Sequence, residues 1–424
     1  MRQSPILPAP KSPATQTVLW RDFRVTVLSD RLFRIEEDST RTFNDRATQS
    51  VLYRNFPPVP FRTGEADATL TVATDAATLT LSEDSAQCFV LSGGVRHPLD
   101  NSGNLLGTTR TLDCFDGEYN IRDEHRLTLS PGVCSRDGVA VLDDTVSLTL
   151  DADGCPDVAS PDRSDRYVFA YGHDYRAAVL ALYRLTGLPP MLPRFAFGNW
   201  WSRYHAYTDR EYLHLMDRFA AADIPLTVAT LDTDWHYSSH LDEEKGITAS
   251  GKNTADRGCL ETPENRRIGW TGYSWNRNLF PDPHAFLQAL HRRGLRVTLN
   301  LHPASGVRYY EDASPAMAEA MGTDPRTEAV IPFDVSSKRF LEAYFRILHH
   351  PLEQDGVDFW WIDWQQGTAS AKDGLDPLWA LNHYHYLDHA ARHRHPLIMS
   401  RYAGIGSHRY PIGFSGDTTI SWAT

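Results

Sequence analysis

The sequence predicts an α/β protein that joins an N-terminal β-sandwich to a (β/α)8 TIM barrel, of which about six strands are present. Two observations predict this fold. Residues 19 to about 160 contain short alternating runs separated by turn signals, without helical periodicity. From about residue 166, apolar strand-like runs alternate with helical ones, which is the order expected of a parallel sheet.

The first 165 residues are predicted to form the sandwich domain. Its clearest strands are runs rich in Val, Thr and Leu at residues 23–28, 68–74, 77–82 and 146–152. Ser-Gly, Asp-Gly and Asn-Ser pairs between such runs are typical of turns. Many short strands at this spacing favour two packed sheets.

Residues 166–193 are predicted to connect the two domains. A helical pattern covers residues 173–187 and ends at Gly187, a residue type common directly after a helix. The next segment, LPPMLP (188–193), stops the helix, because proline disfavours the helical conformation in the residue before it. The barrel domain is expected over residues 194–424.

The barrel domain is predicted from an alternation of strands and helices. The strands are expected at residues 195–200, 225–235, 295–303, 357–364, 396–401 and 411–417, and the helices at 209–224, 284–294, 337–356 and 378–394. A doubly wound open sheet is the rival, but its Gly-rich GxGxxG turn is absent. A closed barrel needs eight strands. Because the chain ends after the sixth, we expect it to be the N-terminal part of a longer protein.

Composition excludes several classes of function. The chain has 424 residues, of which 41% are apolar, and a net charge of −12, which argues against nucleic acid or an anionic membrane as partner. The five cysteines are scattered, without a CxxC pair, so neither a disulfide framework nor a zinc site is expected. Neither a transmembrane stretch nor a signal peptide is evident, and a cytoplasmic location is expected. No cofactor or metal is indicated, and the oligomeric state stays open.

Polar and aromatic side chains follow the predicted barrel strands where each strand ends. They are Trp200, Trp201, Asp232, Asp234, His302, Asp363, Arg401 and Asp417. Functional groups of barrels lie at the carboxyl ends of the strands, so these residues are expected at one site. A single carboxylate there could equally be a helix cap, but the set together favours a site.

These residue types indicate a chemistry. Two carboxylates flanking a glycosidic bond are the usual equipment for its hydrolysis, one attacking or activating water and the other protonating the departing oxygen. Arg401 could pair with Asp363 and keep it ionised. Tryptophans cluster in the second half of the chain, and their rings could stack on sugars, although plain core packing explains an isolated tryptophan better.

Five segments, in order, resemble motifs of glycoside hydrolase family 31, the α-glucosidase and α-xylosidase group. They are LDTDWH (231–236), NLFPDP (278–283), Trp361-Ile362-Asp363, Met399-Ser400-Arg401 and Gly416-Asp417. The segments 103–117 and 129–144 also look like parts of the N-terminal sandwich of that family. The resemblance covers nearly the whole chain.

The resemblance implies roles for individual residues. Asp363 would be the nucleophile of a retaining double displacement, and Asp417 the acid/base. Asp234, Asp232, Trp200, Trp201, His302, Trp361 and Arg401 would bind an α-linked oligosaccharide or glycoside. Gln365 and Gln366 stand where Asn-Glu is usual, and Thr418 where Asn is usual, so the sugar stays open.

Several alternatives stay open at this stage. An α-transglycosylase would use the same residues, and a non-catalytic carbohydrate-binding homologue or an inactive fragment is the third candidate. A barrel for phosphorylated substrates would need a phosphate loop after strands seven and eight. The histidines of 383–395 are expected on a solvated helix face rather than at a metal. The polar segment 241–269 is expected to be a surface loop or a disordered insertion.

Overall fold

The computed structural model describes residues 6–84, 87–107, 109–113, 119–120, 125–126, 129–157, 163–237, 270–327, 329–420 and 422. Contacts divide the chain into two compact units. Unit 1 comprises Met1–Pro189, Tyr402–Arg409 and Ser415–Thr424, and unit 2 comprises Pro190–Arg401 and Tyr410–Phe414. The return of two late segments to unit 1 is a feature that no sequence pattern indicates. The proposed domain limits 1–165, 166–193 and 194–424 therefore stay a prediction.

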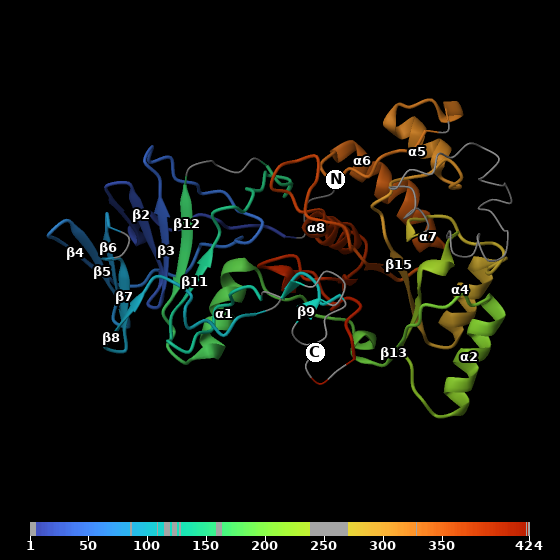
Figure 1. Cartoon of the computed structure of the whole chain (residues 1–424), viewed down its shortest axis with the longest axis horizontal. Coiled ribbons are helices and arrows are strands. Elements are labelled where there is room, and N and C mark those ends of the chain that lie inside the picture. Colours follow the sequence, from blue (N-terminus) through green and yellow to red (C-terminus); the bar gives the residue numbers. More distant parts are fainter. Residues whose placement is uncertain are drawn as a thin grey trace. The chain divides into compact units, whose positions relative to one another are not determined.

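Unit 1 is built on two five-stranded antiparallel sheets (Figure 1). The first has the order β1 (Thr17–Trp20), β2 (Phe23–Ser29), β3 (Leu32–Glu37), β12 (Ser164–Phe169), β11 (Ala140–Asp143). The second has the order β4 (Arg62–Ala66), β5 (Thr69–Ala73), β6 (Ala77–Ser82), β7 (Phe89–Ser92), β8 (Val95–Pro98). Alternate residues of both sheets, such as Val25, Ile35, Val72 and Leu79, share one apolar core, which confirms the predicted N-terminal β domain. A two-stranded ribbon, β9 (Tyr119–Asn120) with β10 (His125–Arg126), is separate.

Helix α1 (Tyr175–Thr186) belongs to unit 1. Asp174 caps it by accepting a hydrogen bond from the amide of Ala177, and Gly187 follows it with a φ of 112°. Its apolar face packs with Tyr167 and Phe169 of β12 in a second core cluster. The segment predicted as a linker therefore contributes core packing to the first unit.

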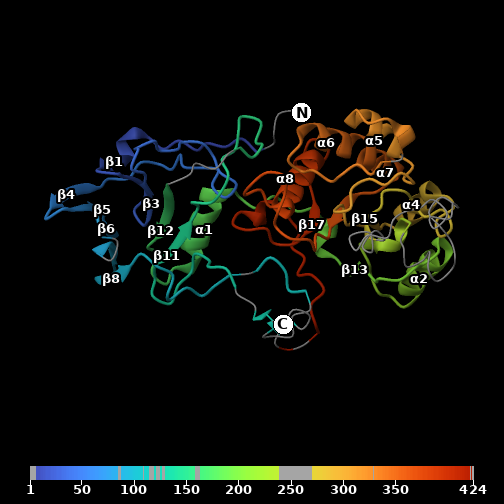
Figure 2. The same ribbon diagram turned by 45° about the horizontal axis from the view of Figure 1, so that its top comes forward.

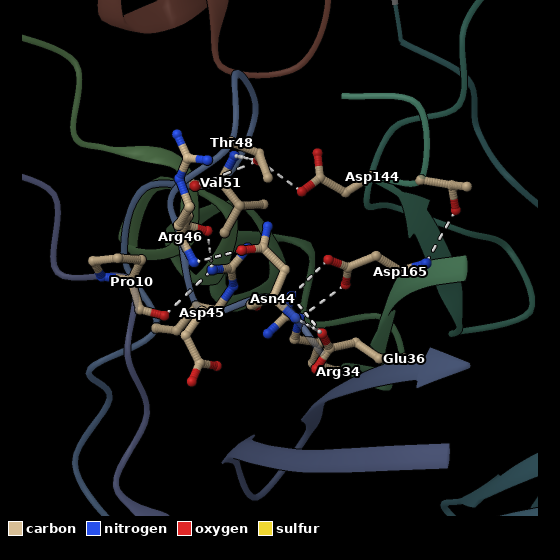
Figure 3. Close-up of polar contacts among 12 residues, drawn as sticks. Pro10, Arg34, Glu36, Asn44, Asp45, Arg46, Thr48, Val51, Asp144 and Asp165 are labelled. Atoms are coloured by element: carbon tan, nitrogen blue, oxygen red, sulfur yellow. Dashed lines mark hydrogen bonds and ion pairs between the residues drawn. The ribbon is translucent and has the colours of Figure 1, made fainter. Parts of the chain in front are cut away.

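Unit 1 also contains a cluster of buried charged residues beside β3 and β12 (Figure 3). The Arg34 guanidinium donates two hydrogen bonds to Asp165, at 2.8 and 2.6 Å, and lies 3.0 Å from Glu36. Burial would raise the pKa of Asp165, but Arg34 holds it below its usual range. Burial and the nearby charge of Asp165 raise the pKa of Asp144 to about 6. The Asp144 carboxylate accepts a hydrogen bond of 2.7 Å from the hydroxyl of Thr48.

Unit 2 is built on a five-stranded parallel sheet. Its order is β13 (Trp200–Trp201), β14 (Val228–Leu231), β15 (Arg296–Leu301), β16 (Phe359–Ile362), β17 (Ile398–Ser400). The helices are α2 (Asp209–Ala221), α4 (Pro283–Arg292), α5 (Ser314–Met321), α6 (Lys338–Ala343), α7 (His350–Asp355) and α8 (Pro377–Ala390). A π-helix, Tyr344–His349, joins α6 to α7, and α5, α6 and α7 lie together (Figure 2). The strand and helix order is that of a barrel, as predicted.

Two of the six predicted barrel strands differ in the structure. Of residues 195–200, the first three belong to a 3₁₀ helix, Arg194–Phe197, and only Trp200 lies in a strand, at the start of β13. Residues 411–417 form only a short pairing, with one isolated bridge between Ser400 and Gly413. The amides of Ile398 and Ser400 donate to the carbonyls of Pro411 and Ile412, and the amides of Ile412 and Phe414 donate to those of Ile398 and Ser400, so residues 411–414 lie parallel to β17. Helix α5 is absent from the predicted elements, because its eight residues carry little periodicity.

Local sequence explains where the main helices begin. Thr208 and Glu211 form a reciprocal capping box at the start of α2. Asp282 caps α4, and Pro283 occupies its first turn, where no amide partner is needed. Within the described ranges, no helix has both the length and the apolar composition to cross a bilayer.

Candidate active site

The predicted site residues of unit 2 follow consecutive parallel strands. His302, Asp363 and Arg401 each come directly after β15, β16 and β17. The register pairs Leu301 with Ile362, and Ile362 with Ser400, so the next residue of each strand lies at the same level. Parallel pairing therefore places these three side chains next to one another at the carboxyl edge of the sheet.

Asp363 is the centre of this group. Its Oδ1 accepts a hydrogen bond of 3.1 Å from Arg401 Nε and a second, shorter one from the terminal nitrogen of Arg401. Its Oδ2 lies 3.2 Å from His302 Nε2 and 3.3 Å from Asn300 Nδ2. The structure thus brings together Asp363, Arg401 and His302, as predicted, and adds Asn300.

All members of this group are buried. Asp363 is 4% exposed, Arg401 1% and His302 4%. Burial would raise the pKa of Asp363, but the hydrogen bond and charge of His302, together with Arg401, outweigh it and lower the pKa to about 2. Asp363 is therefore an ionised carboxylate in a site that excludes most water, which suits a nucleophile.

Arg401 is held from behind by helix α8. The side-chain amide of Asn382 donates a hydrogen bond of 3.0 Å to the carbonyl of Arg401. The guanidinium also lies over the ring of Phe414, 5.1 Å from its centroid. These contacts fix the backbone and the side chain of the cation that pairs with Asp363.

Asp232, at the end of β14, is a second carboxylate near this group. Burial raises its pKa, and the negative charge of Asp363 adds to that effect, while hydrogen bonds from Thr233 oppose it. Its Oδ1 accepts from the amide and hydroxyl of Thr233, at 2.7 and 3.1 Å. Asp234 is buried in the following 3₁₀ turn and lines a small hollow together with Asp232 and Arg203. The two carboxylates Asp232 and Asp363 thus have pKa values shifted in opposite directions.

The predicted tryptophans have different positions. The ring of Trp200 lies 5.4 Å from Phe359 of β16, whereas that of Trp201 packs on Phe219 of α2 at 4.8 Å. Neighbouring residues of a strand point to opposite faces, so only one of the two can face the barrel interior. Trp361 is buried and packs on Phe414 at 5.1 Å. The role of each in sugar binding stays a prediction.

Asp417 belongs to unit 1, whereas Asp363 belongs to unit 2. Asp417 is exposed, and its amide donates a hydrogen bond of 2.6 Å to the carboxylate of Asp113. The nearby Ser415 carbonyl accepts a hydrogen bond from the amide of Leu112. The role of Asp417 as acid/base stays a prediction.

The expectation of a solvated histidine face on α8 is wrong. His383, His385 and His389 are all at most 5% exposed. They contact the Tyr410 hydroxyl at 2.7 Å, the Tyr344 hydroxyl at 3.0 Å and the Asp358 carbonyl at 2.9 Å. Only His393 and His395 are exposed. The described part of the chain has no cluster of three or more metal-binding side chains. The segment 241–269 lies outside the described residues.

Sequence reasoning does not single out two residues near Asp363. Asn300 stands two positions before His302 on the same face of β15, and this spacing could have indicated it. Trp270, whose ring lies 5.3 Å from that of His302, is only one of many tryptophans in this half of the sequence. Trp270 precedes the motif NLFPDP by eight residues and lies outside the predicted strands, so no strand end indicates that it is near the site.

A family model and a curated relative both point to one glycoside hydrolase family. Residues 189–424 match the glycosyl hydrolases family 31 TIM-barrel domain. An α-xylosidase of Saccharolobus solfataricus is 21% identical over 285 residues, which cover 61% of this chain and 33% of that protein. The chain thus spans about a third of the length of this curated relative.

Solved structures share the fold at low identity. An α-xylosidase of this family from a soil metagenome, complexed with xylose, has a TM-score of 0.58 at 11% identity, covering 96% of this chain and 67% of that one. The cycloalternan-forming enzyme of Listeria monocytogenes, in complex with a pentasaccharide substrate, has a TM-score of 0.62 at 14% identity. It is covered to 46%, and this chain to 96%.

Proposed function

Because the chain belongs to glycosyl hydrolase family 31, we propose that it cleaves α-linked glycosides by a retaining double displacement with Asp363 as the nucleophile. One observation supports this assignment most directly. Asp363 is 4% exposed and yet has a pKa lowered to about 2, since His302 and Arg401 outweigh the effect of burial. A desolvated carboxylate that stays ionised at neutral pH can attack without first losing a proton.

In the first step of the proposed reaction, a carboxylate oxygen of Asp363 attacks the anomeric carbon, and the bond to the leaving oxygen breaks. We assign the proton for that oxygen to Asp417, by its resemblance to the acid/base motif. In the second step, Asp417 takes a proton from water, the water oxygen attacks the anomeric carbon, and Asp363 leaves as a carboxylate. Two inversions release the sugar as the α-anomer.

The substrate class is proposed from the relatives. The α-xylosidases suggest an α-xyloside first and an α-glucoside second. Asp234, Asp232, Trp200 and Trp361 are proposed to contact the sugar from unit 2, in addition to His302 and Arg401. Transglycosylation is the second candidate, favoured by the likeness to the cycloalternan-forming enzyme, and it differs only in that a sugar hydroxyl replaces water.

The test is hydrolysis of aryl α-xyloside and aryl α-glucoside by the chain, by Asp363→Ala and by Glu319→Ala. Glu319 is exposed on helix α5 and provides a carboxylate control. We expect the control to keep its activity and Asp363→Ala to lose at least about 10³-fold in kcat. Added azide should restore cleavage activity to Asp363→Ala by replacing the missing nucleophile. The product should be the β-glycosyl azide, because a single displacement inverts the anomeric centre. Full activity of Asp363→Ala would contradict the proposal.

A further inference from the structure

The segment 270–276 of unit 2 is largely buried although it contains neither an α-helix nor a strand. Its polar groups therefore need partners outside regular structure. The amide of Asn276 donates to the carbonyl of Trp235 at 2.9 Å, and Gly272 packs so closely on His236 that an added Cβ would lie 2.2 Å from its ring. Its rings pack on neighbouring elements, Tyr273 on Tyr344 and Trp275 on Trp235, and further hydrogen bonds link it to the loop that follows β15.

One end of this segment contacts the group of residues around Asp363. The ring of Trp270 lies 5.3 Å from the ring of His302, and His302 Nε2 lies 3.2 Å from Asp363 Oδ2. Among the described residues, His302 Nδ1 is buried without a hydrogen-bond partner. The imidazole is thus oriented by Asp363 on one side and by a ring contact on the other, and no hydrogen bond from the described part of the chain fixes its second nitrogen.

The other end of the segment is held by a buried carboxylate. Glu311 is 3% exposed, and one of its oxygens accepts hydrogen bonds of 3.1 Å from the Tyr273 amide and 2.6 Å from the Ser274 hydroxyl. The same hydroxyl accepts a hydrogen bond of 2.8 Å from the amide of Asp312. A third link joins the two chain stretches, because the Ser305 amide donates to the hydroxyl of Thr271 at 3.2 Å.

These contacts link the loop after β15 and the segment 270–276 to each other at more than one point. His302 begins the loop that contains Ser305 and Glu311, and Trp270 begins the segment that Glu311 holds. A buried carboxyl oxygen and a buried amide are both costly without partners, so the hydrogen bonds of Glu311 to Tyr273 and Ser274 are kept and hold this segment in place.

We propose that Glu311 is a positioning residue of the active site, which holds residues 270–276 so that Trp270 fixes His302 against Asp363. This inference rests on the proposed function for its catalytic consequence. Glu311 itself touches neither Asp363 nor His302 in any hydrogen bond or ion pair that the described residues make. It acts through the backbone that carries Trp270.

The alternative is that Glu311 only stabilises the loop. Burial raises its pKa to about 7, against the hydrogen bonds from Ser274 and Tyr273, so keeping a carboxyl at this position has a cost in stability. A structural role and a positioning role both need an acceptor oxygen here, because the buried Tyr273 amide and Ser274 hydroxyl would otherwise lose their partner. The two roles differ in their consequence, since only a positioning role also changes His302 and Asp363.

The experiment compares three variants with wild type. Glu311→Gln keeps an acceptor oxygen for Tyr273 and Ser274, Glu311→Leu removes it, and Glu319→Leu changes an exposed glutamate of α5 as the control. We expect Glu311→Leu to lose about 10- to 100-fold in kcat with little change in KM, since small misplacements of reacting groups cost this much. The acid limb of its pH–kcat profile, which reports the ionisation of Asp363, should move up by about one pH unit. Glu311→Gln and the control should stay close to wild type.

Two further measurements keep the test decisive. If Glu311→Leu does not fold, Ser274→Ala removes the shorter of the two bonds and should shift the acid limb in the same direction. The titration of His302, followed by NMR and assigned with His302→Gln, should also change in Glu311→Leu, whether or not any glycoside is cleaved. An inactive wild type with a changed His302 titration would overturn the proposed function alone. A lowered stability with an unchanged acid limb and an unchanged His302 titration would overturn the positioning role.

Discussion

Replacing Arg401 by methionine should expose how strongly the ion pair holds Asp363 in its charged form. The pKa of Asp363 lies at about 2, against an ordinary value of 3.8. This difference is worth about 2 kcal/mol in favour of the folded state at neutral pH. Because the pKa is lowered on folding, this stabilisation is present above pH ~4 and is lost as the pH falls through about 2.

Arg401→Met leaves a buried carboxylate with His302 and Asn300 as its remaining partners. Breaking one side of a buried ion pair typically costs about 3–5 kcal/mol, because the other charge stays desolvated. We therefore expect the free energy of unfolding at pH 7 to fall by that amount, and the pKa of Asp363 to rise to 3.8 or above. Urea unfolding at several pH values measures both effects.

The double variant Arg401→Met/Asp363→Asn removes both charges, which separates the ion pair from general packing. It should recover most of the lost stability at pH 7, so that the two changes are coupled by at least about 2 kcal/mol. Asp363→Asn alone should leave Arg401 buried and without its carboxylate partner, and should also be destabilised. Additive effects of the two single changes would refute the claim that Arg401 compensates the charge of Asp363.

Two further predictions concern positions away from Asp363. Burial raises the pKa of Asp144 to about 6, so its ionised form is unfavourable in the folded state. Asp144→Asn should therefore gain about 2–3 kcal/mol of unfolding free energy relative to wild type as the pH rises from 4 to 8. A difference in unfolding free energy that does not change with pH would count against this. Gly306→Ala should lose about 2 kcal/mol or more in urea unfolding, since Gly306 has a φ of +71° and an added Cβ would lie 2.1 Å from the Ile331 carbonyl oxygen; unchanged stability would contradict this close approach of the two backbones.

Much of unit 2 could be predicted from the sequence, because strong apolar runs mark its central strands. β14, β15, β16 and β17 all lie within predicted strands. The sequence also predicts helix α8, but not its surroundings. Its apolar and polar residues show little preference for one face, since nearly every residue of the helix is buried. Hydrophobic periodicity identifies a helix with one solvent-exposed face, so it could not show that His383 and His385 lie in the core.

The sixth predicted strand shows a different limit. Residues 411–417 alternate in a way that favours a strand, and residues 411–414 do exchange backbone hydrogen bonds with β17. The pairing ends at Phe414, and Gly416 follows with a φ of 91°, a conformation that does not continue a strand. Tertiary context also decided the position of Trp201, since a shift of one residue along a strand moves a side chain to the opposite face.

The contrast between Asp363 and Asp417 follows from the same physics. His302, Asp363 and Arg401 each occupy the first position after a strand, so their meeting requires only that three consecutive strands pair in parallel without a shift. Strong apolar strands make that pairing robust, and a local pattern is enough to predict it. Asp417 lies three residues beyond Phe414, where the pairing with β17 ends. The segment before it alternates between the two units, Tyr402–Arg409 in unit 1 and Tyr410–Phe414 in unit 2. Arg409 explains this path, because its buried guanidinium donates hydrogen bonds to the carbonyls of Gln49, Ser50 and Thr186. The position of Asp417 therefore depends on contacts with residues far away in the sequence, which no local pattern in residues 401–417 can reveal.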